Sequence, residues 1–315
     1  MKPVPTNEDR IWAVIAHLSA VAFGMGILLP VIGWSEQRRK SNYISFQCLQ
    51  ALGYQSLGYT IWFLIYLLVA VILVIIIVIA LPVVAAENVQ FDKFMLGWMS
   101  ILIVFMFGML AAYLLLPVVA ATSCAFGRDF HYPILGKRLA DYLGYDSIVN
   151  SEDQTWLIEE NEERWVAAMG HFSILIMLWG MLAPFTVLLL QGRHSFFLKF
   201  QSIQTLIYQG LTTILYFGAG FIYVFGIFLV AATMGIIENT QAGSSEMIPG
   251  FIIFIIVSFI AIAMLLLVPL LHVVGQYAGY RVLKGDNYHY PVIGRFVQKS
   301  LLRSSLGSET LMELT

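Results

Sequence analysis

FQCLQALGYQ, at residues 46–55, recurs 154 residues later as FQSIQTLIYQ, at residues 200–209, with six of the ten positions identical. Self-similarity at a fixed offset is the sequence signature of a repeated structural unit. The chain is therefore a tandem duplication, and both halves are expected to form the same arrangement of helices. The same offset also aligns Arg10 with Arg164, Ala13 with Ala167, His17 with His171, Ser19 with Ser173, Gly26 with Gly180, Pro30 with Pro184, Gln37 with Gln191 and Arg39 with Arg193.

The composition indicates an integral membrane protein. Hydrophobic residues make up 59% of the 315 residues and charged residues only 11%, too few to cover a water-soluble surface. The net charge of -2 gives no basis for nucleic-acid binding. The polar N-terminus does not resemble a signal peptide, and we expect it to be retained. Cys48 and Cys124 lie in apolar stretches without partners at metal or redox spacing, so reduced thiols are expected.

Each half contains one interrupted apolar run followed by two long ones. In the first half, the run 11–34 is broken by Gly24-Met25-Gly26 and Pro30, and the runs 44–86 and 94–126 follow. About 20 helical residues cross a bilayer core of about 30 Å, so the later runs are long enough to span it. We expect an all-α, polytopic fold in which each repeat has a broken or re-entrant hairpin, two long transmembrane helices and a short amphipathic helix. The corresponding runs of the second half are 165–190, 203–237 and 247–279.

The placement of the bases distinguishes two topologies. If both interrupted runs cross the membrane, the 17 Lys and Arg residues divide ten against seven between the two sides. If both runs are re-entrant hairpins, turning near Gly24-Met25-Gly26 and Trp179-Gly180, sixteen lie on one side and only Lys93 on the other. The positive-inside rule favours the hairpins and places both termini in the cytoplasm. The exposed backbone of such a hairpin must be buried in protein.

A second motif, His-Tyr-Pro-x-x-Gly followed by a base, closes both halves. It contains His131, Tyr132 and Pro133 in the first half and recurs as His289, Tyr290 and Pro291 in the second. The preceding Gly127 and Gly285 are expected to end helices, and the two prolines to be the first residues of new ones. A metal site at His131 and His289 is disfavoured because neither has a second ligand at a suitable spacing.

The segment after Pro291 has the pattern of an amphipathic helix. Three bases recur every fourth residue, while apolar residues gather on another face. This arrangement predicts a helix lying on an anionic membrane leaflet, with the bases in contact with lipid headgroups. The bases are Arg295, Lys299 and Arg303, and the apolar residues are Val292, Ile293, Phe296 and Val297.

The order of these motifs resembles that of a known family. The pattern Arg-Ile-Trp-Ala-x-x-x-His-Leu-Ser-Ala from Arg10, the interrupted run, the Phe-Gln stretch and the His-Tyr-Pro segment together resemble a bacterial membrane family of unknown function. That family is similar to the twenty-kilodalton subunit of the chloroplast inner-envelope import complex, the Tic complex. The resemblance covers both repeats and implies a four-helix membrane bundle, with only a faint implication of a role in protein translocation.

Two sets of polar residues recur within the apolar runs. His17 and His171 are either an ion-handling pair or, as we favour, neutral imidazoles bonded to a backbone carbonyl that the broken helix exposes. Gln47 and Gln50, repeated as Gln201 and Gln204, lie on one helical face. Their amides either hold the long helix against the hairpin or the repeats together, which we favour, or line a substrate path. The long runs contain no Asp, Glu, Lys or Arg, which argues against a proton-coupled transporter.

The sequence favours a non-enzymatic scaffold or accessory subunit of a membrane protein assembly. Gly218, Gly220 and Gly226 suit close packing with another helix. The alternative is a passive channel or a protein-translocation pore component; an intramembrane enzyme is the third choice, because no catalytic or cofactor motif is present. We expect a multi-pass protein of the bacterial inner membrane, with membrane-protein partners or a homo-oligomer besides the bilayer. The expected divisions are a first repeat at 1–145, an acidic linker at 146–163, a second repeat at 164–298 and a tail at 299–315.

Overall fold

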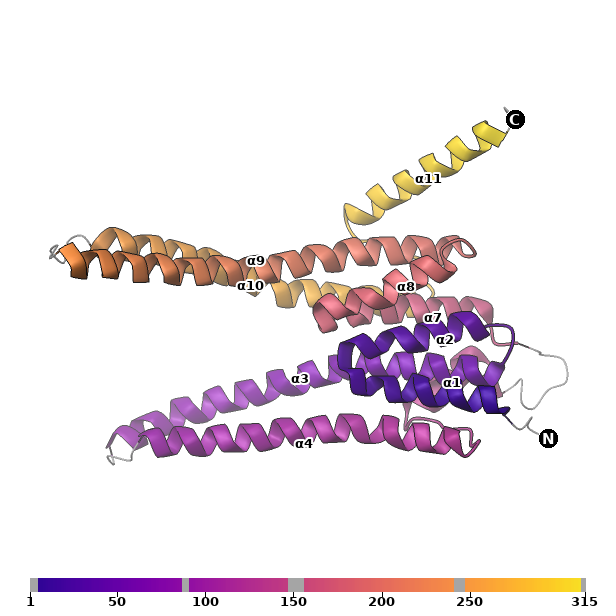
Figure 1. The fold of residues 1–315 in the computed structure, drawn as a ribbon, viewed down its shortest axis with the longest axis horizontal. Helices are drawn as coiled ribbons and strands as arrows, with labels where there is room; N and C mark the ends of the chain where they lie inside the picture. Colours follow the sequence, from indigo (N-terminus) through magenta and orange to yellow (C-terminus); the bar gives the residue numbers. More distant parts are fainter. Residues whose placement is uncertain (1–4, 87–90, 147–155, 241–246, 313–315) are drawn as a thin grey trace.

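The fold is a bundle of helices at one end with two long helical arms extending from it (Figure 1). The computed structural model describes residues 5–86, 91–146, 156–240 and 247–312. Within these residues all regular secondary structure is helical, and six stretches are long and apolar enough to cross a membrane. The expectation of an all-α, polytopic membrane protein is confirmed.

Each repeat begins with a helical hairpin. In the first, α1 (Asn7–Leu18) leads through a 3₁₀ segment, η1 (Ser19–Ile27), into α2 (Leu28–Gln37), which lies beside α1 (Figure 1). The chain reverses at Phe23, whose φ is 50°. At the open end, Gln37 Nε2 donates to Glu8 Oε1 at 3.2 Å, so the two ends of the run meet. This apolar run, although long enough to span, therefore enters and leaves at the same end of the molecule.

The second repeat forms the same hairpin. Its limbs are α7 (Glu159–Phe172) and α8 (Leu182–Gln191), joined by η2 (Ser173–Met181). The reversal falls at Met177, with φ of 54°, and Met177 lies 154 residues after Phe23. The acidic residues expected to end a linker, Glu159–Glu163, instead form the first turns of α7.

In each turn, one glycine lies so close to a backbone carbonyl that no side chain fits. A Cβ on Gly26 would lie 1.9 Å from Ser19 O, and one on Gly180 would lie 2.0 Å from Ser173 O. Both distances are far below a van der Waals contact, so a side chain at either position would force the turn open. At the start of α1, Thr6 is the N-cap and Asp9 completes a capping box.

Two long helices follow each hairpin. They are α3 (Asn42–Ala86) and α4 (Phe91–Ala125) in the first repeat, and α9 (Phe196–Thr240) and α10 (Met247–Leu283) in the second. At about 1.5 Å per residue, the 45 residues of α3 extend about 67 Å, more than twice a bilayer core. The first turns of α3 and α9 are largely buried in the bundle, and the far parts of the four helices form the apolar arms (Figure 1).

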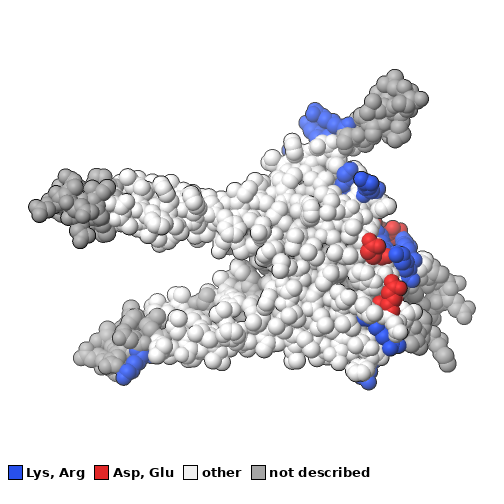
Figure 2. All heavy atoms as spheres, viewed as in Figure 1, with Lys and Arg blue, Asp and Glu red and all other residues white. Residues whose placement is uncertain are grey.

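The charges mark the two ends of the molecule. Figure 2 shows blue and red atoms gathered at the bundle end, white arms, and one blue group at the tip of the lower arm. Lys93, the third residue of α4, lies at that far end of the arm. The described structure is thus a multi-pass arrangement of four long helices with hairpins at the base-rich end. The positive-inside rule predicts that this end is cytoplasmic.

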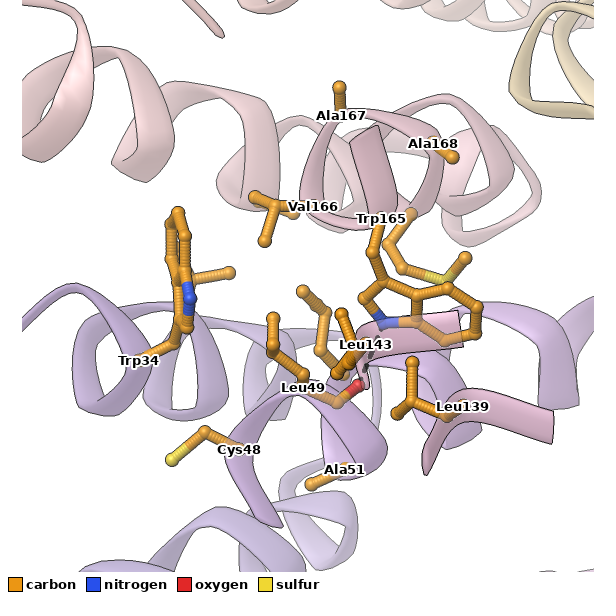
Figure 3. Close-up of a cluster of buried hydrophobic side chains, with 14 of the residues drawn as sticks. Trp34, Cys48, Leu49, Ala51, Leu139, Leu143, Trp165, Val166, Ala167 and Ala168 are labelled. Carbon is orange, nitrogen blue, oxygen red and sulfur yellow. Dashed lines mark hydrogen bonds between the residues drawn. The ribbon is translucent and has the colours of Figure 1, made fainter. Parts of the chain in front are cut away.

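The two repeats share one hydrophobic core (Figure 3). Trp165 of α7 reaches across to α3, where its Nε1 donates to Leu49 O at 2.9 Å. Its ring lies against Gly53, where a Cβ would stand 2.4 Å from the indole. Leu139 and Leu143, from the short helix α5 (Leu135–Leu143), pack into the same core. The two repeats therefore form one packed body.

An ion-pair cluster joins the repeats beside this core. Arg38, at the end of the first hairpin, lies 3.0 Å from Glu159, 3.4 Å from Glu162 and 3.2 Å from Glu163 of α7. Trp34 Nε1 donates to the buried Glu162 at 3.1 Å. Glu159 is exposed, but Arg38, Glu162 and Glu163 are largely buried, so removing one of these three would leave an uncompensated charge in the interface.

The residues that join the repeats are not themselves repeated. Positions equivalent to Trp34, Arg38 and Gly53 hold Leu188, Gly192 and Ile207, and the position equivalent to Trp165 holds Ile11. The two halves thus share the residues that build each repeat and differ where the repeats meet.

The helices after the His-Tyr-Pro segments begin later than expected. α5 starts at Leu135 and α11 (Ile293–Met312) at Ile293, so Pro133 and Pro291 precede the helices by two residues. Gly127 and Gly285 do adopt positive φ, 72° and 99°. Among the three arm glycines, Gly226 packs closely on Val257 of α10, whereas a Cβ built on Gly220 would meet no other part of the chain within 4 Å. The Gly226 contact lies within the chain, so packing of these glycines against a partner protein stays a prediction.

Candidate functional site: a duplicated buried polar network

A network of hydrogen bonds surrounds the repeated histidine in each half. His17 is fully buried, with Nε2 2.9 Å from Gln47 Oε1 and Nδ1 3.1 Å from the Tyr132 hydroxyl. The three residues come from α1, from α3 and from the turn after α4. One imidazole therefore joins the hairpin, the long helix and the exit from the second span.

The second repeat reproduces this network. His171 is fully buried, with Nε2 3.0 Å from Gln201 Oε1 and Nδ1 3.0 Å from the Tyr290 hydroxyl. Thr205, which replaces Ala51, adds a hydroxyl 3.0 Å from His171 Nδ1. The duplication has thus preserved the arrangement as well as the residues.

The backbone determines which atom donates in each bond. Gln47 Nε2 donates to Phe130 O at 3.0 Å, and a carbonyl can only accept, so Gln47 Oε1 faces the histidine. His17 Nε2 must then carry the proton, which leaves Nδ1 as an acceptor for the Tyr132 hydroxyl. Burial raises the pKa of Tyr132 well above its usual value, so the phenol stays protonated and donates. The same reasoning applies to His171, because Gln201 Nε2 donates to Tyr288 O at 3.3 Å and burial likewise raises the pKa of Tyr290.

The second glutamine of each pair holds the His-Tyr-Pro segment. Gln50 Nε2 donates to Phe130 O at 2.9 Å, and its Oε1 accepts from the Tyr132 backbone N–H. Gln204 makes the same two bonds, to Tyr288 O at 2.8 Å and from Tyr290 N at 3.2 Å. The motif glycine permits this approach, since a Cβ on Gly136 would lie 2.5 Å from Gln50 Oε1.

Stacked tyrosines complete each network. The rings of Tyr54 and Tyr132 stack with centroids 4.4 Å apart, and those of Tyr208 and Tyr290 with centroids 4.0 Å apart. Tyr54 donates its hydroxyl to Tyr113 O of α4 at 2.7 Å, and Tyr208 donates to Leu271 O of α10 at 2.9 Å. The penultimate residue of the Phe-Gln stretch thereby bonds to the second long helix of each repeat.

The carbonyls exposed by the broken helices bind glutamine, and the histidine prediction is wrong on this point. Gln55 Nε2 lies 3.3 Å from Ala16 O and 2.9 Å from Ser19 Oγ. Gln209 Nε2 lies 2.8 Å from Gly170 O in the second repeat. The histidines bond to glutamine and tyrosine side chains instead. Gln55 and Gln209 are a repeated pair in the sequence. The sequence does not show where α1 and α7 break, however, so it does not indicate that these glutamines bond to the carbonyls exposed there.

The remaining candidate residues lie outside the two networks. His131 and His289 are partly exposed and pack against Phe46 and Phe200, with ring centroids 4.9 and 4.7 Å apart. In the part of the chain that the structure describes, no three His, Cys, Asp or Glu residues are placed to hold a metal ion. Arg295, Lys299 and Arg303 lie exposed on α11, away from both networks.

Each network is a closed set of hydrogen bonds that joins the hairpin, the long helix and the His-Tyr-Pro turn, and we call it the clasp of its repeat. Gln47, Gln50, Gln201 and Gln204 are buried, with amide groups bonded to the protein itself. Bonds between such amides and their partners contribute about 0.6–2 kcal/mol each in a membrane protein. The geometry suits holding the hairpin, long helix and turn in fixed positions.

Comparison with known proteins gives one match. A family model described as the magnetosome magnetite crystal formation protein family matches residues 8–139. The match covers the first repeat, less than half of the chain. It overturns the resemblance to the Tic subunit, because the first-repeat motifs that suggested that resemblance match this different family. No curated protein and no solved structure shows a significant match.

Proposed function

We propose that this chain is a non-enzymatic membrane scaffold that acts in the formation of mineral crystals at a membrane. The family match supports the role in mineral formation, because the matched family is described by magnetite crystal formation. The match spans the elements of the first clasp up to Leu139, and the second repeat carries the same bonds. As a scaffold, the chain would hold other membrane proteins of an assembly in place.

The observation that carries the scaffold role is the doubled clasp within one fused body. Each clasp fixes a hairpin against a long helix, and Trp165 and Arg38 join the two repeats. Four long helices leave this body with exposed apolar side chains along their arms. A rigid helical bundle whose membrane helices expose apolar side chains is suited to positioning neighbouring proteins within the bilayer.

The channel alternative receives no comparable support. It required the glutamine faces to line a path, whereas their amides are buried and bonded to histidine, tyrosine and backbone groups. The translocation-pore version also rested on the Tic resemblance, which the family match replaces.

Deleting the gene in its host and imaging intracellular mineral particles by electron microscopy tests the proposed context. We expect an altered distribution of crystal sizes that the wild-type gene restores. A double variant, Gln50→Leu with Gln204→Leu, should reach the membrane and restore the distribution poorly, because both clasps are broken. Gln298→Leu, an exposed amide on α11, is the matched control and should restore it fully.

A host that forms no mineral, or crystals unchanged by the deletion, would refute the mineral context. The scaffold role is tested separately by mild detergent extraction, cross-linking and mass spectrometry. We expect defined membrane-protein neighbours that are lost in the double variant. A monodisperse protein that cross-links to no membrane protein would refute the scaffold.

A further inference from the structure

The C-terminal helix α11 is attached to the bundle by one narrow face. Val297 and Leu301 of α11 are 2% and 8% exposed, and they form a small core with Phe200 of α9. Ile203 and Ile207 of α9 pack against the same core. The helix then runs outward from the bundle (Figure 1). The contact with α9 accounts for only part of the apolar surface of α11.

A second apolar surface remains exposed on α11. Phe296 is 68% exposed and Leu302 is 49% exposed, although sequence periodicity had placed Phe296 on the same face as Val297. At about 100° per residue, Arg295, Lys299 and Arg303 form a stripe on the side opposite Val297. Phe296 and Leu302 border this stripe on its two edges. The helix thus presents bases flanked by large apolar side chains.

The residue immediately before α11, at what we call the foot of the helix, is apolar, exposed and held in a strained turn. Val292 has φ of 68° and is 79% exposed, and Ile293 N donates to Pro291 O at 2.8 Å, which closes a γ-turn. A β-branched residue at positive φ is a conformational outlier. Ile134 repeats the arrangement, with φ of 64° and 75% exposure. Strain of this kind is common where a surface contacts a ligand or partner.

The position of α11 along α9 places this surface at the level of the lipid headgroups. The contact involves residues 200–207 of α9, and beyond it the exposed large apolar residues of α9 begin one turn later, at Leu211; before it, only Phe196 at the start of the helix is strongly exposed. Figure 2 shows the blue atoms at the foot of α11 facing the side on which the arms extend. The segment 293–303 contains no acidic residue. Its charge therefore complements an anionic layer.

We propose that the exposed face of α11 docks on the anionic leaflet of the membrane that the protein spans. Arg295, Lys299 and Arg303 bind headgroup phosphates, and Phe296 and Leu302 enter the boundary between headgroups and acyl chains. Val292 inserts beside them at the foot of the helix. This docking fixes α11 relative to the bundle and does not depend on the proposed role in mineral formation.

Hydrogen exchange of the full-length protein in lipid nanodiscs tests this docking. The discs are made from phosphatidylcholine alone or from phosphatidylcholine with phosphatidylglycerol. Exchange of the amides in 293–303 should be slower in the anionic discs, by about fivefold for each base that contributes. Arg295→Gln, Lys299→Gln and Arg303→Gln combined should remove the difference between the two lipids, and Phe296→Ser with Leu302→Ser should reduce it.

The matched control removes three exposed bases of the same end that lie outside α11: Lys40→Gln, Arg193→Gln and Lys284→Gln. It should keep the full difference. Exchange in α9 reports that each variant is folded. Equal exchange of wild-type α11 in both lipids would overturn the proposal, as would a difference that persists in the α11 triple variant. Slowing by inorganic phosphate in neutral discs would also overturn it, by showing that free anions and not a leaflet occupy the bases.

Discussion

The imidazoles of His17 and His171 each lie between a glutamine oxygen, which accepts a hydrogen bond, and a tyrosine hydroxyl, which donates one. A backbone carbonyl fixes the orientation of each glutamine amide. The carbonyl of Phe130 orients Gln47, the Gln47 oxygen sets the tautomer of His17, and the imidazole then accepts from Tyr132. Because every step depends on the one before, removal of one amide disturbs the whole clasp. At the residue scale, the repeated polar side chains therefore act as a unit.

Gln50→Leu and Gln204→Leu should each destabilise the protein by about 1–3 kcal/mol. Each change leaves a buried tyrosine N–H without its acceptor, which incurs the desolvation penalty of that group. Thermal unfolding in detergent measures the effect. Gln298→Leu should leave the midpoint unchanged, and equal midpoints for all three variants would show that the clasp does not contribute to stability.

Gly26→Ala and Gly180→Ala should each lower stability by about 1–3 kcal/mol, because the new Cβ overlaps a serine carbonyl in the hairpin turn. Gly220→Ala is the comparison, since nothing lies within 4 Å of its Cβ. In a helix, that change should be neutral or stabilising by up to about 1 kcal/mol. Thermal midpoints that fall equally for the turn and arm variants would contradict the close approach in the turns.

At the scale of elements, each hairpin depends on what it packs against. The limbs of the first are held by Gln37 at the open end and by Gln55 at the turn. The second hairpin is also the contact between repeats, because α7 provides Trp165 to the core and carboxylates to Arg38. Equivalent elements thus have unequal roles, and the difference arises from a few residues that the duplication does not share.

Trp165→Ala should destabilise the protein by about 3–5 kcal/mol, since it removes a buried indole together with its hydrogen bond to Leu49 O. Ile11→Ala, at the equivalent position of the first repeat, should change stability by about 0.5 kcal/mol or less, because Ile11 is largely exposed. Limited proteolysis between the repeats should accelerate only in the tryptophan variant. Similar effects of the two changes would argue against a core shared by both repeats.

The sequence predicts the elements better than their contacts. Hydropathy and charge placement anticipate the helical class, the long helices and the hairpins, because each depends on local composition. The partner of His17 is not predictable, since Gln47 and Tyr132 meet it only after three elements pack. The contact between repeats is also missed, although Trp165 opposite Ile11 in the repeat alignment was a visible signal. Phe296 was misplaced because helical periodicity does not show how many partners a helix has.

At the scale of the whole molecule, the account rests on hairpins that enter and leave at one end. Both hairpins and the start of α11 lie at the bundle end (Figure 1), where the bases gather (Figure 2), and Lys93 lies near the start of α4 at the other end. The clasps, the core between repeats and the surface of α11 all belong to that same end. If the hairpins instead crossed the bilayer, these features would be divided between the two sides of the membrane.

Cysteine accessibility tests this topology most directly. Single variants Asn7→Cys, Lys40→Cys and Lys93→Cys are labelled with an impermeant maleimide in spheroplasts and in inverted membrane vesicles. The native Cys48 and Cys124 are buried and should react little. We predict that residues 7 and 40 react only in the inverted vesicles and residue 93 only in the spheroplasts. Labelling of residues 7 and 40 from opposite sides would contradict the hairpins and, with them, the proposed architecture.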